Sequence, residues 1–235
     1  MKTNNFIKGG NIKLGNMGTI SKLYGNDVRI VPGIGPIKGS CGSYCAGCKK
    51  ACYVAKSYRY PSVILSHART TQAIRSNIYD YFQSLQKQID RKKKPYDIIR
   101  INQSGELESY DELIQYNVLA FFNPGIEFYV YTKRYDLLKR FTNEGEIFCD
   151  NFHVLISVWG ENGIQEYLEL SEKQNVNAFV YRNHEYTNGY YNEHGLQINK
   201  ECNAYKNRKL NKAVTCDKCR KCFTGSCNVI ACDDH

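Results

Sequence analysis

Hydrophobic positions follow two different periods along this 235-residue chain. Within Ser62–Lys93, apolar and aromatic side chains recur at the spacing of an α-helix. They are Ile74, Ile78, Tyr81, Phe82, Leu85 and Ile89. We therefore expect Ser62–Lys93 to be helical. Beyond it, apolar residues occur in short continuous runs, a pattern typical of strands that are buried on both faces of a parallel sheet.

These runs alternate with segments of helical periodicity. The predicted strands are Tyr96–Ile101, Glu127–Tyr131, His153–Val158 and Ala178–Tyr181, and the last of these is expected to be the final strand. The predicted helices are Ser109–Phe122, which begins with the capping box Ser109-x-x-Glu112, Tyr135–Phe141 and Gly163–Lys173. The alternation predicts an α/β fold with about four or five β/α units. Because a closed eight-unit barrel takes roughly 250 residues, we expect a partial (β/α) barrel or an open sheet.

The two ends of the chain show less periodicity. Residues 1–40 are rich in Gly and Asn, and we expect an irregular N-terminal arm with one or two short strands, of which Val28–Val31 is the clearest. Residues 41–182 would form the partial barrel and carry the first cysteines of the chain. Residues 183–235 are polar and tyrosine-rich, and we expect an irregular, cysteine-rich C-terminal tail that packs on the barrel.

The composition is that of a globular protein. Hydrophobic residues make up 42% of the chain and charged residues 23%, which argues against disorder. The N-terminal residues lack the apolar run of a signal peptide. No stretch approaches the roughly 18 apolar residues that span a bilayer. We therefore expect a cytoplasmic protein with no membrane partner.

The formal net charge of +9 raises the question of nucleic-acid binding. The dense basic run Arg91–Lys94 precedes Pro95 at the expected end of a helix, where cations interact favourably with the helix dipole. Metal-bound thiolates would also reduce the positive excess. The charge therefore gives only weak support to a nucleic-acid partner.

Nine of the eleven cysteines fall into two groups. The first cysteine group is Cys41, Cys45, Cys48 and Cys52, and the second cysteine group is Cys216, Cys219, Cys222, Cys227 and Cys232. Cys149 and Cys202 stand apart, and we expect each to be a small buried residue rather than a ligand. Because the cytoplasm keeps thiols reduced, such grouping indicates a bound metal more than disulfide bonds.

Iron–sulfur clusters and zinc compete for these thiols. The spacing Cys216-x2-Cys219-x2-Cys222 is the run that bacterial ferredoxins use, and Cys227 or Cys232 is available as a fourth ligand. Zinc sites often pair two C-x2-C units about 15–20 residues apart. Here the second group begins 164 residues after the first one ends. The sequence favours 4Fe–4S clusters, either two separate ones or one larger bridged cluster, over zinc and over disulfides.

The first cysteine group carries a more specific resemblance. Cys41-x3-Cys45-x2-Cys48 resembles the three-cysteine loop of the radical S-adenosylmethionine enzymes. In that family three thiolates hold a 4Fe–4S cluster, and S-adenosylmethionine binds the fourth iron. Two departures are Gly47, where the family usually has an aromatic residue, and Cys52, an extra thiol that could occupy the fourth iron.

The resemblance extends to the residues after the strand Tyr96–Ile101. In the family, a Gly-Glu pair at this place meets the amino group of S-adenosylmethionine. Gly105 and Glu106, preceded by Ser104, match that pair and are implied to face the cofactor. The fold that the resemblance implies is a partial barrel of β/α units.

A closer resemblance covers most of the chain. The segments NIKLGNMGTISKLYG, GSCGSYCAGCKKACYV, IRINQSGELESYDE, FYVYTKR and CDKCRKCF are similar to the phage-encoded gene product 88 family over roughly Asn11–Phe223. The resemblance implies a cysteine-rich, radical-SAM-like protein of a phage or prophage that acts in the bacterial cytoplasm. It implies no substrate.

Three functions remain open on these observations. The first is an iron–sulfur protein with radical S-adenosylmethionine chemistry of the oxidoreductase or transferase kind, which would need an electron donor. The second is a non-catalytic iron–sulfur protein for electron transfer, redox sensing or structure. The third, less favoured, is a zinc-stabilised nucleic-acid binder. Any substrate would meet residues at the strand ends, namely Thr132, Lys133, Trp159, Arg182 and His184, although each alone is better explained as a core or surface residue.

Overall fold

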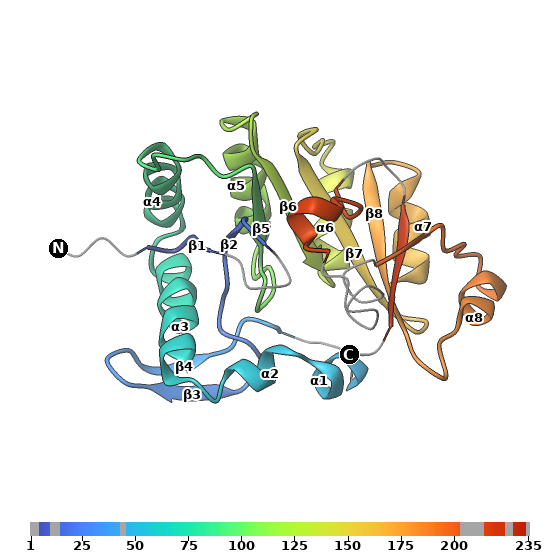
Figure 1. Cartoon of the computed structure of the whole chain (residues 1–235), viewed down its shortest axis with the longest axis horizontal. Helices are drawn as coiled ribbons and strands as arrows, with labels where there is room; N and C mark the ends of the chain where they lie inside the picture. Colours follow the sequence, from blue (N-terminus) through green and yellow to red (C-terminus); the bar gives the residue numbers. More distant parts are fainter. Residues whose placement is uncertain (1–4, 10–14, 43–45, 203–213, 224–227, 234–235) are drawn as a thin grey trace.

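One mostly parallel sheet of eight strands organises the chain (Figure 1). The computed structural model describes residues 5–9, 15–42, 46–202, 214–223 and 228–233. In spatial order the strands are β1 (Lys8–Gly9), β2 (Gly18–Thr19), β5 (Ile98–Ile101), β6 (Glu127–Thr132), β7 (Phe152–Trp159), β8 (Val176–Arg182), β10 (Val229–Asp233) and β9 (Lys200–Glu201). The β1–β2 pair is antiparallel, and the pairs from β2 through β9 are parallel. The predicted α/β fold class is confirmed.

Helices pack against one face of this sheet, and in Figure 1 α5, α6 and α7 lie behind the strands. The longer helices are α3 (Pro61–Ser76), α4 (Ile78–Asp90), α5 (Tyr110–Phe121), α6 (Tyr135–Asn143) and α7 (Ile164–Ser171). The shorter ones are α1 (Ala46–Ala51), α2 (Val54–Ser57), α8 (Asn188–Glu193) and α10 (Cys216–Cys219). A separate antiparallel hairpin joins β3 (Val28–Val31) and β4 (Gly35–Lys38).

The alternation of side chains along the strands divides the core between two faces of the sheet. On β5, Ile99 and Ile101 belong to the large cluster that contacts the helices, whereas Ile98 belongs to a smaller cluster. The buried members of the smaller cluster are Met17, Ile98, Tyr129, Leu155, Phe223 and Ile230. Because Phe223 comes from the C-terminal tail, we call this side the tail face. Figure 1 shows α10 in front of it.

The prediction for Ser62–Lys93 needs one correction, because the helical segment is broken at Asn77. Asn77 has extended backbone angles, and its side-chain oxygen accepts hydrogen bonds from the backbone N–H groups of Tyr79 (3.0 Å) and Asp80 (3.2 Å). It is thus the N-cap of α4, and Asn is among the residues preferred there. The apolar period continues across the break, which is why periodicity alone did not reveal it.

The prediction that Ala178–Tyr181 is the final strand is wrong, because the tail adds two further strands, whereas the predicted short strand Val28–Val31 of the arm is present as β3. The tail adds β10, which pairs in parallel with β8, and β9, which pairs with β10. The arm adds β2, which pairs with β5. β2 and β9 have two residues each, and β10 has five. Such short runs give no period of their own, and the neighbouring strands determine their conformation.

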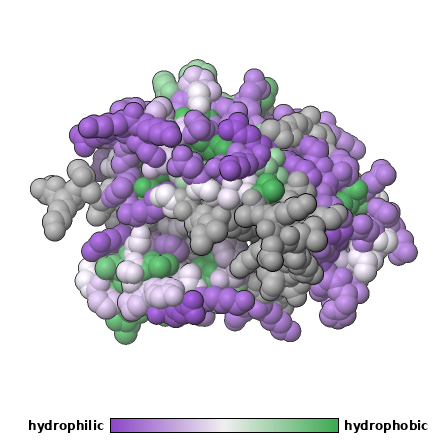
Figure 2. All heavy atoms as spheres, viewed as in Figure 1, coloured by the Kyte–Doolittle hydropathy of each residue, from purple (hydrophilic) through white to green (hydrophobic). Residues whose placement is uncertain are grey.

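The surface in Figure 2 is mostly hydrophilic. A small apolar patch at the lower left lies over the β3–β4 hairpin, where Val28 and Ile30 are 64% and 86% exposed. Within the described ranges, no helix combines the length and apolar character needed to cross a membrane.

Candidate functional site

The loop after β5 is fixed by the N-terminal arm. The backbone N–H of Gln103 donates to the Ile20 carbonyl (2.9 Å), and the N–H of Lys22 donates to the Ser104 carbonyl (2.8 Å). The Ser104 hydroxyl donates to the Lys22 carbonyl (2.9 Å). Ser104, one of the residues implied to face a cofactor, therefore uses its hydroxyl to hold the arm.

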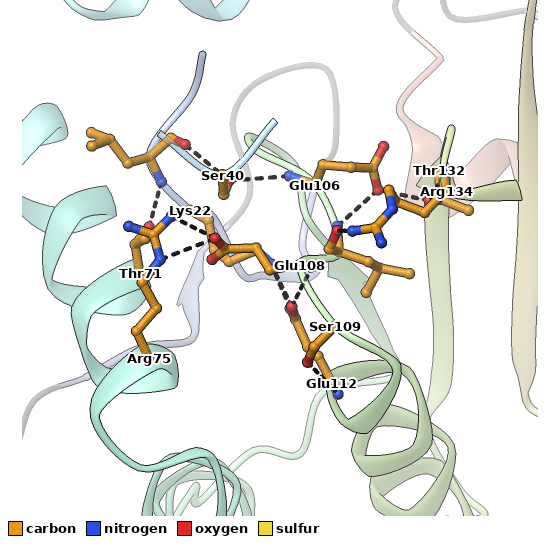
Figure 3. Close-up of polar contacts among 12 residues, drawn as sticks. Lys22, Ser40, Thr71, Arg75, Glu106, Glu108, Ser109, Glu112, Thr132 and Arg134 are labelled. Carbon is orange, nitrogen blue, oxygen red and sulfur yellow. Dashed lines mark hydrogen bonds and ion pairs between the residues drawn. The ribbon is translucent and has the colours of Figure 1, made fainter. Parts of the chain in front are cut away.

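Gly105 allows a close approach of two other segments. Its φ of +83° lies in the left-handed region, which favours glycine. A Cβ atom at this position would lie 2.3 Å from the Ser40 Oγ and 2.8 Å from the Lys22 Cβ. The Ser40 hydroxyl also accepts a hydrogen bond from the Glu106 N–H (3.2 Å), as Figure 3 shows. Gly105 thus brings the start of the first cysteine group against the end of β5.

The Glu106 carboxylate is buried, with 8% of the residue exposed. Its Oε1 accepts hydrogen bonds from the Thr132 hydroxyl (2.7 Å) and the Leu107 N–H (2.8 Å). Its Oε2 accepts one from the Lys133 N–H (2.9 Å). Because each carboxylate oxygen can accept two hydrogen bonds, Oε2 has the capacity for one donor more than the described residues supply. Glu106 thus joins the ends of β5 and β6.

A buried ion pair supports this loop from below (Figure 3). The Lys22 ammonium lies against the Glu112 carboxylate, which also accepts a hydrogen bond from the Glu108 N–H (2.9 Å). Burial raises the pKa of Glu112, and Lys22 opposes that rise. One of the two hydrogen bonds of the predicted capping box is present, since the Ser109 hydroxyl accepts from the Glu112 N–H (3.2 Å). The Glu112 side chain instead accepts from Lys22.

The Cys41 thiol lies beside this loop. Its Sγ accepts a hydrogen bond from the Gly25 N–H (3.2 Å). Burial raises the pKa of Cys41 to about 11; the Gly25 N–H lowers it, Glu106 and Cys52 raise it and Lys133 lowers it. These effects require the four side chains to lie within electrostatic reach of one another. Two thiols of the first cysteine group and Glu106 therefore share one region at the strand ends.

The rest of the first cysteine group surrounds α1. Cys48 lies on α1 and is partly exposed, and Cys45 lies outside the described residues. Burial raises the pKa of Cys52, whereas the N–H groups of Val54 and Ala55 and the charge of Lys133 lower it. The start of α2 thus presents backbone donors to the Cys52 sulfur.

The strand-end residues proposed to line a pocket separate into two kinds. Thr132 and Lys133 contact Glu106, and the Lys133 Nζ lies 5.4 Å from the centre of the Trp159 ring. Arg182 instead pairs with Asp233 (2.7 Å) and Glu201 (3.3 Å), which joins β8 to the tail strands. The His184 side chain is 88% exposed. The first three therefore adjoin the candidate site and the other two do not.

The second cysteine group lies mainly on the tail face. Cys216 and Cys219 are the ends of α10, Cys222 follows it, and Cys232 is buried in β10. Cys227 lies outside the part of the chain that the structure describes. Cys216 and Cys222 pack against the tail-face cluster.

Arg100 of β5 lies between the two cysteine groups. Its Nη2 donates to the hydroxyl of Tyr53 (3.3 Å), the residue after Cys52. Burial lowers the pKa of Arg100, whereas nearby tyrosines and the Cys216 thiol raise it. The thiols of the two groups are therefore on neighbouring parts of the molecule. Sequence reasoning missed Arg100 because a single cation within a strand carries no motif.

Lys22 was missed for a related reason, since it is one of many polar residues in the N-terminal arm. Lys22 is completely buried because β2 pairs with β5, and no local sequence pattern predicts that pairing. The signal that could have suggested a partner is Glu112, an acidic residue within an otherwise apolar helix face.

The described thiols are not arranged around a single ion. Among the described residues, no three His, Cys, Asp or Glu side chains are grouped closely enough to hold one metal ion. Sulfurs around one tetrahedral zinc lie about 3.8 Å apart, given Zn–S bonds of about 2.3 Å. Thiolates of a four-iron cluster bind different irons and are therefore spread more widely.

Comparison with known proteins identifies a family. The family model described as Gene product 88 matches residues 6–225. No curated protein and no solved structure matches the chain.

Proposed function

The chain belongs to the gene product 88 family, and from this premise we propose that it is an iron–sulfur protein of phage or prophage origin. The first cysteine group would hold a 4Fe–4S cluster beyond the carboxyl ends of β5 and β6. The observation that carries the proposal is the gathering of the Cys41 and Cys52 thiols with Glu106 and Lys133 at that edge. Ligands bind at this edge in α/β proteins.

The donors around the sulfurs fit such a cluster. Backbone N–H groups point at both thiols, from Gly25 to Cys41 and from Val54 and Ala55 to Cys52. Hydrogen bonds to the ligating sulfurs are one of the means by which a protein adjusts an iron–sulfur cluster. Burial disfavours a bare thiolate at Cys41, so a bound cation there would compensate for the missing solvent.

We further propose that the sheet is the partial barrel of a radical S-adenosylmethionine enzyme. A 4Fe–4S cluster with S-adenosylmethionine at its open iron supplies one-electron reduction and a carbon radical. Glu106 would accept a hydrogen bond from the amino group of that cofactor at its Oε2 atom. Gly105 would keep the loop close to the cysteines, and Lys133 with Trp159 would form one wall of the site.

A second function is favoured by the position of Cys52. The Cys52 thiol is close enough to raise the pKa of Cys41, so Cys52 would lie within reach of the same cluster. As a fourth ligand it would close the site, and the protein would then serve electron transfer, redox sensing or structure. For either function we propose that the protein acts in the cytoplasm of the bacterial host.

The experiment is purification without oxygen, followed by iron and sulfide analysis, visible spectra and paramagnetic resonance. We expect a brown protein that loses iron in Cys41→Ser and Cys48→Ser and keeps it in Cys149→Ser, the matched control outside both cysteine groups. Addition of S-adenosylmethionine should change the paramagnetic spectrum of the reduced protein if Cys52 leaves the site open. A colourless protein with zinc in place of iron would overturn the proposal.

A further inference from the structure

The tail face carries a thiol that belongs to neither cysteine group. We infer that Cys202 is a ligand of a second iron–sulfur cluster. Its co-ligands are Cys216, Cys219 and Cys222. Arg100 supplies a partly buried positive charge beside them. The inference rests on the proposed function in one respect, namely that the chain binds iron–sulfur clusters.

The short tail strands determine the position of Cys202. It directly follows β9, and its N–H donates to the Ala231 carbonyl of β10 (2.8 Å). The parallel register pairs Ala231 with Glu201, so its continuation by one residue places Cys202 beside Cys232. Cys202 also packs against the tail-face cluster, as Cys216 and Cys222 do. A residue without a cysteine neighbour in sequence is thus among cysteines in space.

The segment around α10 presents the other thiols to the same place. Cys216 and Cys219 are three residues apart on α10 and therefore lie on one side of it. Arg220 has a φ of +53°, which ends the helix and redirects the chain. Phe223 then packs on Tyr129, with ring centres 5.1 Å apart, which anchors the turn on the sheet.

Cys222 is the point where these elements meet. Burial raises the pKa of the Cys222 thiol, and the nearby thiols of Cys202, Cys216 and Cys219 raise it further. The Tyr131 side chain hydrogen-bonds to the Cys222 sulfur. Such a bond is of the kind that stabilises a ligating thiolate.

The charge on Arg100 indicates what these thiols hold. Its guanidinium lies 4.8 Å from the centre of the Tyr131 ring, and its Nε is closed to solvent and has no hydrogen-bond partner among the described residues. Within the described ranges, no Asp or Glu forms an ion pair with Arg100. A partly buried cation without an anion beside it is unfavourable. A four-iron cluster with four thiolates is an anion, and it would supply the missing charge.

The spacing of the thiols along the chain favours a cluster over zinc, because Cys216-x2-Cys219-x2-Cys222 is the run that bacterial ferredoxins use. The described cysteines are not grouped closely enough around one point to hold a single ion. A cluster accepts a wider set of sulfurs because each sulfur binds a different iron. The tail site is therefore assigned to iron and sulfide.

The test uses the full chain with all four residues of the first cysteine group changed to Ala. After anaerobic reconstitution with ferrous iron and sulfide, this parent variant should retain about four irons per chain. Cys202→Ser in the parent should remove nearly all of them, and Cys149→Ser should remove none. The same Cys202→Ser change in the otherwise unaltered chain should remove about half of the iron, which covers the case in which the parent fails to fold.

Each other outcome overturns a distinct statement. Full iron in both Cys202→Ser proteins would show that Cys202 is not a ligand and would leave Cys227 or Cys232 in that role. A folded parent without iron, beside an iron-bearing wild type, would remove the tail cluster and leave the proposed function intact. Zinc in the parent would overturn the assignment to iron and sulfide. A wild type without iron would end both proposals.

Arg100 has a test of its own. In the parent variant, Arg100→Gln should keep the iron and shift the reduction potential to a more negative value, because a nearby positive charge favours the reduced cluster. Arg100→Lys retains the charge and should shift it less. Equal reduction potentials in the parent and in its Arg100→Gln variant would show that Arg100 does not lie beside the cluster.

Discussion

The Lys22 ammonium lies 2.6 and 2.8 Å from the two carboxylate oxygens of Glu112, and neither side chain is exposed to solvent. This pair joins the N-terminal arm to α5 directly beneath the loop that carries Glu106. Two buried charges so close together depend on each other, because either one alone would be buried without compensation.

Removal of one partner should therefore be costly. We expect Glu112→Gln to lower the free energy of unfolding by about 3–5 kcal/mol, as measured by denaturant titration. Replacement of both residues by apolar ones, Lys22→Met with Glu112→Leu, should recover most of that loss. The matched control is Glu169→Gln, which breaks the exposed Lys139–Glu169 pair (2.6 Å) and should leave the free energy of unfolding nearly unchanged. Similar losses in Glu112→Gln and in the control would contradict this view of the pair.

Gly105 and Gly145 offer a comparison between two glycines with nearly the same backbone. Their φ angles are +83° and +79°, but a Cβ at Gly145 would meet no atom within 4 Å. Gly145→Ala should lower stability by about 1 kcal/mol, the cost of a left-handed conformation. Gly105→Ala should cost more, roughly 3 kcal/mol in total, because Ser40 and Lys22 must also move. Thermal unfolding of both variants measures the difference, and equal melting temperatures would show that the loop yields without cost.

His67 predicts how stability depends on pH. It lines a cavity of about 250 Å³, its Nδ1 lies 3.2 Å from the Tyr58 hydroxyl oxygen, and burial lowers its pKa from 6.5 to about 4. Between these two values the unfolded chain binds a proton that the folded protein does not, so stability falls as the pH falls. We expect His67 to account for a loss of roughly 1.5 kcal/mol between pH 6.5 and pH 5.

The check is denaturant unfolding at both pH values. His67→Gln should flatten the pH dependence by that amount, whereas His184→Gln, at a side chain that is 88% exposed, should leave it unchanged. If both variants lose as much stability between pH 6.5 and pH 5 as the unaltered protein, groups other than His67 cause that loss.

The sequence predicted β5 to β8 and α5 to α7 because each has a run of apolar residues long enough to show its own period. It could not predict β2 or β10, since Gly18–Thr19 and Val229–Asp233 become strands through the neighbours with which they pair. The Gly105–Glu106 pair was recognised by resemblance, and its reason became visible only with Ser40 and Thr132 beside it.

The thiols follow the same division. Short spacings revealed both cysteine groups, because neighbours in sequence are neighbours in space. The sequence predicts Cys202 to be a small buried residue rather than a ligand, because its approach to Cys222 depends on the register of β9 with β10; in the structure Cys202 is half-buried. Long-range pairings of this kind leave no periodic trace in the residues that make them.

Ser104 and Glu106 were both expected to face a cofactor, and the structure separates them. The Ser104 hydroxyl donates to the Lys22 carbonyl, whereas the Glu106 Oε2 accepts only the Lys133 N–H among the donors of the described residues. We expect Glu106→Gln to keep its iron and to abolish the effect of S-adenosylmethionine on the paramagnetic spectrum of the reduced protein. Ser104→Ala should retain that effect and lower stability by about 1 kcal/mol, the value of one hydrogen bond.

The loss in Glu106→Gln has two physical components that a further variant separates. The amide cannot accept on both sides, so one of the N–H groups of Leu107 and Lys133 would face a donor. Thr132→Val removes one hydrogen bond to Glu106 and preserves its charge. If the charge binds the cofactor, Thr132→Val should still respond to S-adenosylmethionine. A loss of response in Thr132→Val and Ser104→Ala as well as in Glu106→Gln would mean that loop geometry, rather than the Glu106 carboxylate, governs binding.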